Sequence, residues 1–157
     1  MFLSKNIKES EKHIKELFAD GKESASLCPF YNIKKEYRCF YLNGEILLIY
    51  GKERPYKLTD NNEKVYLSWK HNLCGGAIPE ILEKCELYSK LEKLAIKAAK
   101  AINITFATVD IIETEDNKLY VIEINSGVCM AKFAERTPNG YEISKEIYRK
   151  ALKLLFD

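Results

Sequence analysis

The chain has 157 residues, the size of one ordinary domain, and its hydrophobic fraction of 46% is enough to form a buried core. Lys and Arg number 25 against 23 Asp and Glu, and a net charge of +2 is too small to favour a nucleic-acid or membrane partner through a long-range field. The five cysteines are an odd number without Cys-x-x-Cys spacing, which argues against a disulfide framework and a zinc site.

The first part of the chain predicts a helix followed by a hairpin. The N-terminus becomes polar at Ser4, so it predicts no signal peptide and a cytoplasmic protein. Asn6 with Glu9 three residues later indicates a helix start, and Gly21 indicates its end. Between them lies an apolar stripe of Ile7, Ile14, Leu17 and Phe18. The dipeptide Asn43-Gly44 then predicts a tight turn between strands at 37–42 and 45–50.

The rest of the chain alternates strand and helix patterns. Residues 51–63 are polar and indicate a loop before a short strand at 65–69, and 79–102 has a helical pattern. The helical stripe there consists of Leu87, Leu91, Leu94, Ala95, Ala98 and Ile102. A second hairpin at 105–112 and 119–124 precedes a last helix at 143–156, which is expected to bury Ile143, Ile147, Ala151 and Leu154. This order predicts an α+β fold, an antiparallel sheet with packed helices.

Single acidic residues interrupt the two apolar strands of the second hairpin. The turn between the strands is best placed at Asp116-Asn117, because Asp and Asn tolerate the positive φ of a two-residue loop. This turn sets a register in which Asp110 lies directly across from Glu123. Asn125 is then on the same face, opposite Thr108. Two carboxylates and an amide oxygen are therefore expected to converge.

This convergence favours a bound cation. Like charges directly opposite each other across strands are destabilising, and half-buried carboxylates need a partner. Oxygen-only ligands suit Mg²⁺ or Mn²⁺ better than zinc, and magnesium suggests a phosphate-bearing substrate. The alternative is a solvated hairpin whose acidic residues face water, and the spacing by itself leaves both interpretations open.

Four blocks between residues 69 and 127 carry a family resemblance. They are Lys-His-Asn-Leu-Cys-Gly-Gly-Ala at 70–77, an alanine-rich helix at 94–101, Val-Asp-Ile at 109–111 and Glu-Ile-Asn-Ser-Gly at 123–127. In this order and spacing they resemble the C-terminal subdomain of the ATP-grasp superfamily, closest to ligases that add amino acids such as glutamate to a carboxylate. Upstream, Pro29-Phe30 and Glu36-Tyr37-Arg38 are similar to the family's adenine hinge and its following strand. The resemblance implies one partial ATP-grasp domain, with 1–30 a remnant of the N-terminal subdomain and hinge, and 31–157 the C-terminal subdomain.

The resemblance implies roles for the acidic hairpin and for an arginine. One or two Mg²⁺ (or Mn²⁺) ions bridging the β- and γ-phosphates of ATP would be held by Asp110, Glu123 and Asn125. Arg38 is similar to the family's arginine that contacts phosphate or an acyl phosphate, a task that suits its planar fork. The alternative for Arg38 is a surface strand residue paired with Glu36 or Glu45.

Further catalytic and binding roles follow from the same resemblance. Lys70, where the family often has arginine, and Asn72 match a loop that approaches the reacting phosphate and carboxylate. The alternative for this loop is an ordinary Gly75-Gly76 turn. The backbone at Cys28, Pro29 and Phe30 would bind adenine. Ile122 could line the adenine pocket, although plain core packing is the other interpretation.

The implied function is an ATP-dependent carboxylate–amine ligase that acts through an acyl phosphate. The family's glycine-rich flap and its lysine would precede the first helix, and this chain starts after them. We therefore expect a fragment, one half of a split enzyme, or a relative that serves as a non-catalytic nucleotide-binding or assembly module. Expected partners are a small carboxylate, an amine and either a second copy or a complementing chain, with no nucleic acid and no membrane.

Overall fold

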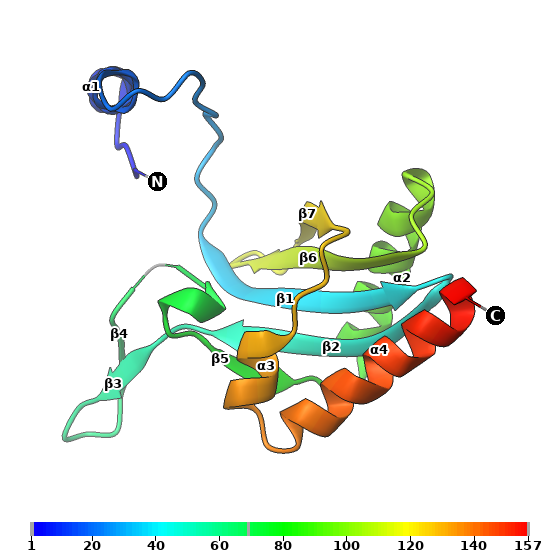
Figure 1. Cartoon of the computed structure of the whole chain (residues 1–157). Coiled ribbons are helices and arrows are strands. Elements are labelled where there is room, and N and C mark those ends of the chain that lie inside the picture. Colours follow the sequence, from blue (N-terminus) through cyan, green and yellow to red (C-terminus); the bar gives the residue numbers. More distant parts are fainter. Residues whose placement is uncertain (1, 69, 157) are drawn as a thin grey trace. The chain divides into compact units, whose positions relative to one another are not determined.

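A computed structural model describes residues 2–68 and 70–156 (Figure 1). Trp69, where the predicted strand at 65–69 ends and the resembling segment begins, lies outside the described residues, as do Met1 and Asp157. The chain divides into two compact units, 1–32 and 33–157. No helix within 2–68 or 70–156 is both long enough and apolar enough to cross a membrane.

The smaller unit contains helix α1 (Ile7–Ala19), which confirms the first predicted helix. The side chain of Asn6 accepts a hydrogen bond from the backbone N–H of Glu9 at 3.0 Å, which satisfies one of the unpaired donors of the first turn. Gly21 ends the helix in the left-handed region at φ +80°. No residue of α1 is buried.

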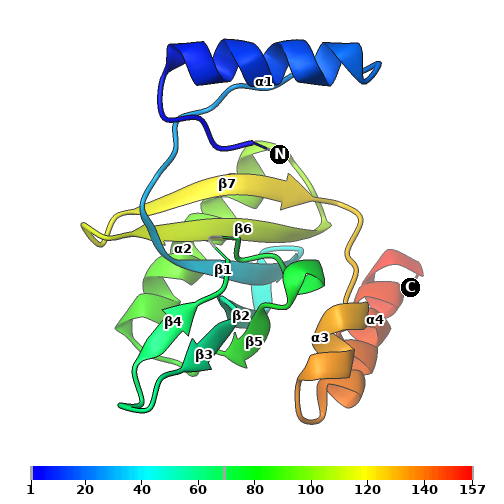
Figure 2. The ribbon, with the colours of Figure 1, turned by 90° about the vertical axis from the view of Figure 1, so that its left-hand side faces the viewer.

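The larger unit is built on a five-stranded antiparallel sheet in the order β5-β2-β1-β6-β7. Its strands are β1 (Ile33–Leu42), β2 (Glu45–Glu53), β5 (Ile78–Ile81), β6 (Phe106–Thr114) and β7 (Leu119–Asn125). Helix α2 (Glu86–Ala101) covers one face, and α3 (Ala131–Arg136) and α4 (Gly140–Phe156) lie on the other (Figure 2). The predicted α+β class is therefore confirmed.

Each face of the sheet has its own core because successive side chains of a strand point to opposite sides. The α2 face buries residues such as Cys39 and Val109 against Leu91. The opposite face buries Phe40, Leu48 and Tyr50 against residues that include Met130, Phe133 and Ile147. The alternation along β1 places Glu36 and Arg38 on the same face as Phe40. This is the face that carries the candidate site.

The first hairpin is confirmed at its predicted turn. Leu42 pairs with Glu45, and the two residues between them, Asn43 and Gly44, both have positive φ. That conformation matches the twist of the flanking strands, and Asn and Gly adopt it at low cost. The hairpin fixes β1 against β2, two of the strands that build the site.

The helix predicted from Pro79 begins later than expected. Ile78–Ile81 forms the edge strand β5, in which Ile81 pairs with Tyr50 of β2. An edge strand tolerates Pro79 because one side of the strand needs no donor. Helix α2 starts at Glu86, after Cys85, whose sulfur accepts from the N–H of Tyr88 at 3.4 Å.

Other elements also differ from the predictions. The polar stretch at 51–63 is not one loop, because β2 continues to Glu53 and a small hairpin pairs β3 (Tyr56–Leu58) with β4 (Lys64–Tyr66). The 3-10 helix η1 (Leu73–Gly75) and helix α3 were not predicted. Helix α4 starts at Gly140 and buries Ile147 and Ala151 as expected, but Leu154 is 45% exposed.

Candidate functional site

The second hairpin has the register that the sequence predicts at its acidic positions. Asp110 is paired with Glu123, and Thr108 is paired with Asn125. Residues directly opposite each other in an antiparallel pair share a face, so both carboxylates and the amide lie on one side of the sheet. This side is opposite α2, because Val109, Ile111 and Ile124 pack against that helix.

The turn of this hairpin is longer than predicted, and a bulge compensates for the difference. Thr114 donates its N–H to the carbonyl of Lys118 at 3.0 Å, so the loop has three residues, 115–117, and not two. This turn alone would shift the register by one residue. The register changes once more between Asp110 and Ile111, where Ile122 is the extra residue of a β-bulge. The predicted pairing at the site is therefore correct although the predicted turn is wrong.

Two cationic side chains hold Asp110. The Nε of Arg38 donates to Oδ1 at 2.7 Å and its Nη2 donates to Oδ2 at 2.6 Å, which makes a bidentate pair. The Nζ of Lys52 donates to Oδ2 at 3.2 Å and also forms an ion pair with Glu36. The Asp110 side chain is 3% exposed and that of Lys52 is 4% exposed. The interpretation of Arg38 as a surface residue paired with Glu36 or Glu45 is wrong.

The electrostatics of this group follow from its geometry. Burial alone would raise the pKa of Asp110, but the hydrogen bonds from Arg38 and the charge of Lys52 outweigh it and hold that pKa below its ordinary value. The hydrogen bonds to Asp110 raise the pKa of Arg38 above its ordinary value, against the opposing effect of burial. Asp110 and Arg38 are therefore both charged at neutral pH.

The other two predicted metal ligands are open to solvent. Glu123 is exposed and Asn125 is half-buried. Among the described residues, no group of three or more His, Cys, Asp or Glu side chains could hold a metal ion, and the predicted set contains only two carboxylates. Its third donor is an amide oxygen. Such an oxygen-only set fits a hard divalent cation that keeps several of its waters.

The predicted catalytic loop is anchored beside Lys52. His71 is 5% exposed, and its Nδ1 donates to the backbone carbonyl of Lys52 at 3.1 Å. Burial lowers the pKa of His71, which favours the neutral ring with its proton on Nδ1. Asn72 caps η1, since its Oδ1 accepts from the N–H of Cys74 at 2.7 Å. The exposed Lys70 donates its N–H to the hydroxyl of Ser68 at 3.1 Å.

Sequence reasoning missed Lys52 and His71. Leu48, Tyr50 and Lys52 are every second residue of β2 and therefore share a face. This pattern would have placed Lys52 on the face of the site if the predicted strand had been extended beyond residue 50. His71 gave no such signal, because its partner is a backbone carbonyl 19 residues earlier in the chain.

Comparison with known proteins shows the family. The model of the RimK-like ATP-grasp domain matches residues 61–150, which is more than half of the chain. The chain belongs to the RimK-like ATP-grasp family. The matched segment contains the loop at 70–77 and both strands of the acidic hairpin.

Two curated relatives of this ATP-grasp chain are tetrahydromethanopterin:alpha-L-glutamate ligases. The protein of Methanocaldococcus jannaschii is 34% identical over 101 residues, which cover 59% of the chain and 33% of the relative. The protein of Methanococcus maripaludis is 30% identical over 95 residues, 60% of the chain and 27% of the relative. The chain therefore spans about a third of the length of these relatives.

Solved structures share the fold of this ATP-grasp chain. D-alanine–D-alanine ligase from Bacillus anthracis, solved with ATP, has a TM-score of 0.63 at 19% identity and covers 94% of the chain and 46% of the ligase. The bifunctional glutathione synthetase from Pasteurella multocida has a TM-score of 0.52 at 16% identity, with coverages of 76% and 24%. At these identities the likeness concerns the fold.

The predicted adenine-binding residues lie in both units of this ATP-grasp chain. Cys28, Pro29 and Phe30 are exposed and belong to the smaller unit. Their role toward adenine stays a prediction. Ile122, the residue of the β-bulge, is 50% exposed, so its interpretation as core packing is wrong. Ile124, in contrast, is half-buried and packs against the α2 core.

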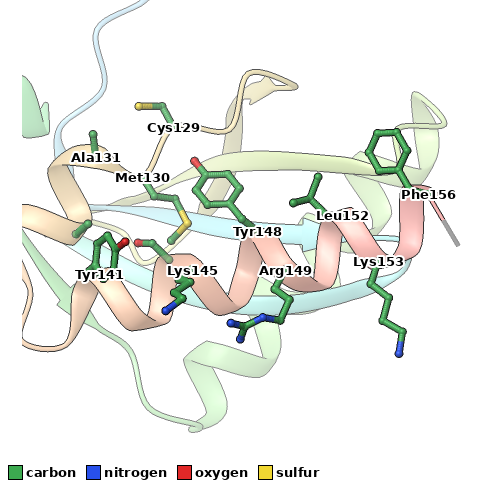
Figure 3. Close-up of a pocket in the computed structure, with 12 residues that line it drawn as sticks. Cys129, Met130, Ala131, Tyr141, Lys145, Tyr148, Arg149, Leu152, Lys153 and Phe156 are labelled. Atoms are coloured by element: carbon green, nitrogen blue, oxygen red, sulfur yellow. The ribbon is translucent and has the colours of Figure 1, made fainter.

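A groove of about 940 Å³ runs along α4, apart from the predicted site residues. Figure 3 shows Tyr148, Leu152 and Phe156 in a row on one side of the helix, with Lys145, Arg149 and Lys153 pointing away from that row. The hydroxyl of Tyr148 donates to the carbonyl of Val128 at 2.8 Å, which ties the helix to the loop after β7. None of the predicted catalytic, metal or adenine residues lines this groove.

Proposed function

We propose that this chain is the ATP- and magnesium-binding part of a carboxylate–amine ligase. The observation that carries the proposal is the shared face of Asp110, Glu123 and Asn125 on two neighbouring strands, with Arg38 beside them. Carboxylate and amide oxygens are the ligands that Mg²⁺ or Mn²⁺ takes in nucleotide sites. The family match supports ATP as the nucleotide.

The chain's own residues would divide the work. The oxygens of Asp110, Glu123 and Asn125 would hold the cation on a rigid sheet. When bound, the metal neutralises the negative charge that develops on a phosphoryl group during transfer. Arg38 would bind a phosphate or acyl-phosphate oxygen pair with its planar fork. In these roles, the groups that stabilise the charge of the phosphoryl group would lie on strands whose register is fixed by the two hairpins.

The loop at 70–77 would bring further groups to the reacting atoms. Its anchor, His71, fixes it to the backbone of β2 beside Lys52. Asn72 shapes the turn, and Gly76 follows in the left-handed region at φ +98°, which needs glycine. Lys70 would contribute a positive charge to the phosphate or carboxylate. The backbone at Cys28, Pro29 and Phe30 would bind adenine.

The proposed reaction has two steps. An oxygen of the substrate carboxylate takes the γ-phosphoryl group of ATP, which releases ADP and gives an acyl phosphate. The amine nitrogen then attacks the acyl carbon, so a C–N bond forms, the C–O bond to phosphate breaks, and the nitrogen loses a proton. The names of the two curated relatives favour L-glutamate as the amine.

A second copy or a complementing chain is part of the proposal. The exposed apolar row of the α4 groove favours such an association, because large exposed apolar patches are uncommon on monomers. Light scattering of the purified chain measures it directly: a mass above that of one chain supports a second copy.

Calorimetry with Mg·ATP tests the proposed site. Glu123→Gln is the informative variant, because Glu123 is exposed and its loss leaves the buried Arg38–Asp110 pair intact. We expect this variant to bind Mg·ATP at least about tenfold more weakly than the wild type, the loss of one charged ligand. Glu115→Gln, in the turn of the same hairpin, is the matched control and should bind normally.

Two results of this experiment count against the proposal. A folded wild-type chain that does not bind millimolar Mg·ATP would remove it, and equal affinity of the Glu123→Gln variant would remove the metal site. Release of ADP on addition of L-glutamate and a carboxylate acceptor supports the ligase. Mg·ATP binding without ADP release in any such mixture supports the non-catalytic nucleotide-binding module.

A further inference from the structure

The carboxylate proposed to hold metal is already fully engaged by cations. Both oxygens of Asp110 accept from Arg38, and Oδ2 also accepts from Lys52. Lys52 in turn forms an ion pair with Glu36. These four side chains carry two positive and two negative charges. Their sum is zero, so the group as a whole offers a divalent cation no attractive net charge.

From this arrangement we infer that Arg38 and Lys52 prevent divalent cations from binding to Asp110 until the phosphates of a nucleotide attract Arg38 away from it. The inference rests on the proposed function, since it concerns the same metal site. It makes metal binding conditional on nucleotide binding. The free chain then holds its metal ligand ready without binding cellular magnesium.

The two cations are placed to play different parts. The Arg38 side chain is 22% exposed, so an incoming phosphate can reach its guanidinium. The Lys52 side chain is 4% exposed and has Glu36 as a second partner, so it keeps a carboxylate when Asp110 turns to metal. Arg38 is therefore the residue that moves, and Lys52 is a positioning residue that holds Asp110 and Glu36 together.

Charge explains why phosphate would open the site. A divalent cation at Asp110 must sit within a few ångströms of the Arg38 guanidinium, and this repulsion weakens binding by more than about tenfold even at an effective dielectric constant near 20. The phosphates of a nucleotide attract the guanidinium, and their own charge also attracts the metal. Nucleotide thus removes the repulsion and adds a ligand in one event.

Binding of Mn²⁺ to the full chain, measured by the paramagnetic resonance of free Mn²⁺, tests the inference. For the wild type we expect weak binding without nucleotide and binding at least about tenfold tighter with ADP, after correction for Mn²⁺ held by free ADP. Arg38→Gln keeps an amide donor toward Asp110 but removes the charge. Without nucleotide it should bind Mn²⁺ at least about tenfold more tightly than the wild type.

Two further variants keep the test informative. Lys118→Gln removes an exposed cation from the turn of the same hairpin and should leave Mn²⁺ affinity unchanged. Arg38→Lys retains the charge and should bind Mn²⁺ without nucleotide no more than about threefold more tightly than the wild type, which supports charge as the cause. If Arg38→Gln does not fold by circular dichroism, Arg38→Lys and the wild type with and without ADP still decide.

The outcomes separate this inference from the proposed function. Equal wild-type affinity for Mn²⁺ with and without ADP, or an Arg38→Gln variant with unchanged nucleotide-free affinity, overturns the inference and leaves the metal site standing. A wild-type chain that binds no Mn²⁺ even with ADP overturns the proposed function as well. A gain in Arg38→Gln that disappears in the double variant with Glu123→Gln supports both.

Discussion

Asp110 receives three hydrogen bonds from two cationic side chains while it is almost completely buried. Asp110→Asn would leave the Arg38 charge without its carboxylate, and breaking a buried ion pair by removing one partner typically costs about 3 kcal/mol. We therefore expect this variant to lose about that much free energy of unfolding in urea. A more stable variant would show that repulsion between Asp110 and Glu123 dominates the site, contrary to the geometry.

The lowered pKa of Asp110 gives a second residue-scale prediction. Its pKa in the folded chain lies below that of the unfolded chain, so ionised Asp110 contributes stability above pH about 4, and this contribution is lost as the pH falls below that value. Between pH 6 and pH 3, the free energy of unfolding measured in urea should fall more steeply for the wild type than for Asp110→Asn. Equal slopes would contradict the ion pair.

The residue pattern predicted which side chains of the second hairpin share a face. Asp110, Glu123 and Asn125 lie on neighbouring strands of one hairpin, where alternation and a short turn decide which side chains meet. The Arg38–Asp110 pair could not be derived in this way, because it joins β1 to β6 across 72 residues of sequence. Cys85 shows the same limit on a smaller scale, since its sulfur caps a helix that the sequence pattern extended through it.

Helix α4 begins where the chain passes very close to α3. A Cβ added at Gly140 would lie 2.7 Å from the carbonyl oxygen of Phe133 and 2.9 Å from the Cα of Ala134, both backbone atoms. Gly140→Ala should therefore destabilise the chain by about 2 kcal/mol, although alanine normally favours a helix. Thermal or urea unfolding measures the loss.

Gly127→Ala is the control for this prediction. Gly127 follows the acidic hairpin, and an added Cβ there meets nothing within 4 Å. Its unfolding free energy should stay within about 0.5 kcal/mol of the wild type. If both variants behave alike, the close approach at Gly140 does not limit the packing of α3 against α4.

Elements with strong local signals were predicted well, and those that depend on distant partners were not. Asn6 and Asn43-Gly44 fix a helix start and a turn by their own backbone preferences. Strand β5 forms because it pairs with the edge of β2, and no local sequence pattern at 78–81 predicts that pairing. The three-residue turn and the bulge at Ile122 compensate for each other, which local turn rules do not anticipate.

At the scale of the whole molecule, one face of the sheet carries the proposed site and the other packs against α2. The α2 face buries mostly apolar side chains, together with the hydrogen bond from Tyr37 to Glu113 and the thiol of Cys39. Burial raises the pKa of Cys39, which disfavours the reactive thiolate. The opposite face combines an apolar core under α3 and α4 with the charged group around Asp110. Both faces depend on the same strand register.

The most direct measurement is the anomalous scattering of Mn²⁺ in crystals of the chain grown with ADP. We expect a Mn²⁺ peak within coordination distance of oxygens of Asp110, Glu123 and Asn125, with the Arg38 guanidinium turned from Asp110 toward a phosphate. Bound ADP with Mn²⁺ held elsewhere, or with the bidentate Arg38–Asp110 pair unchanged and no metal beside it, would contradict the proposed metal site.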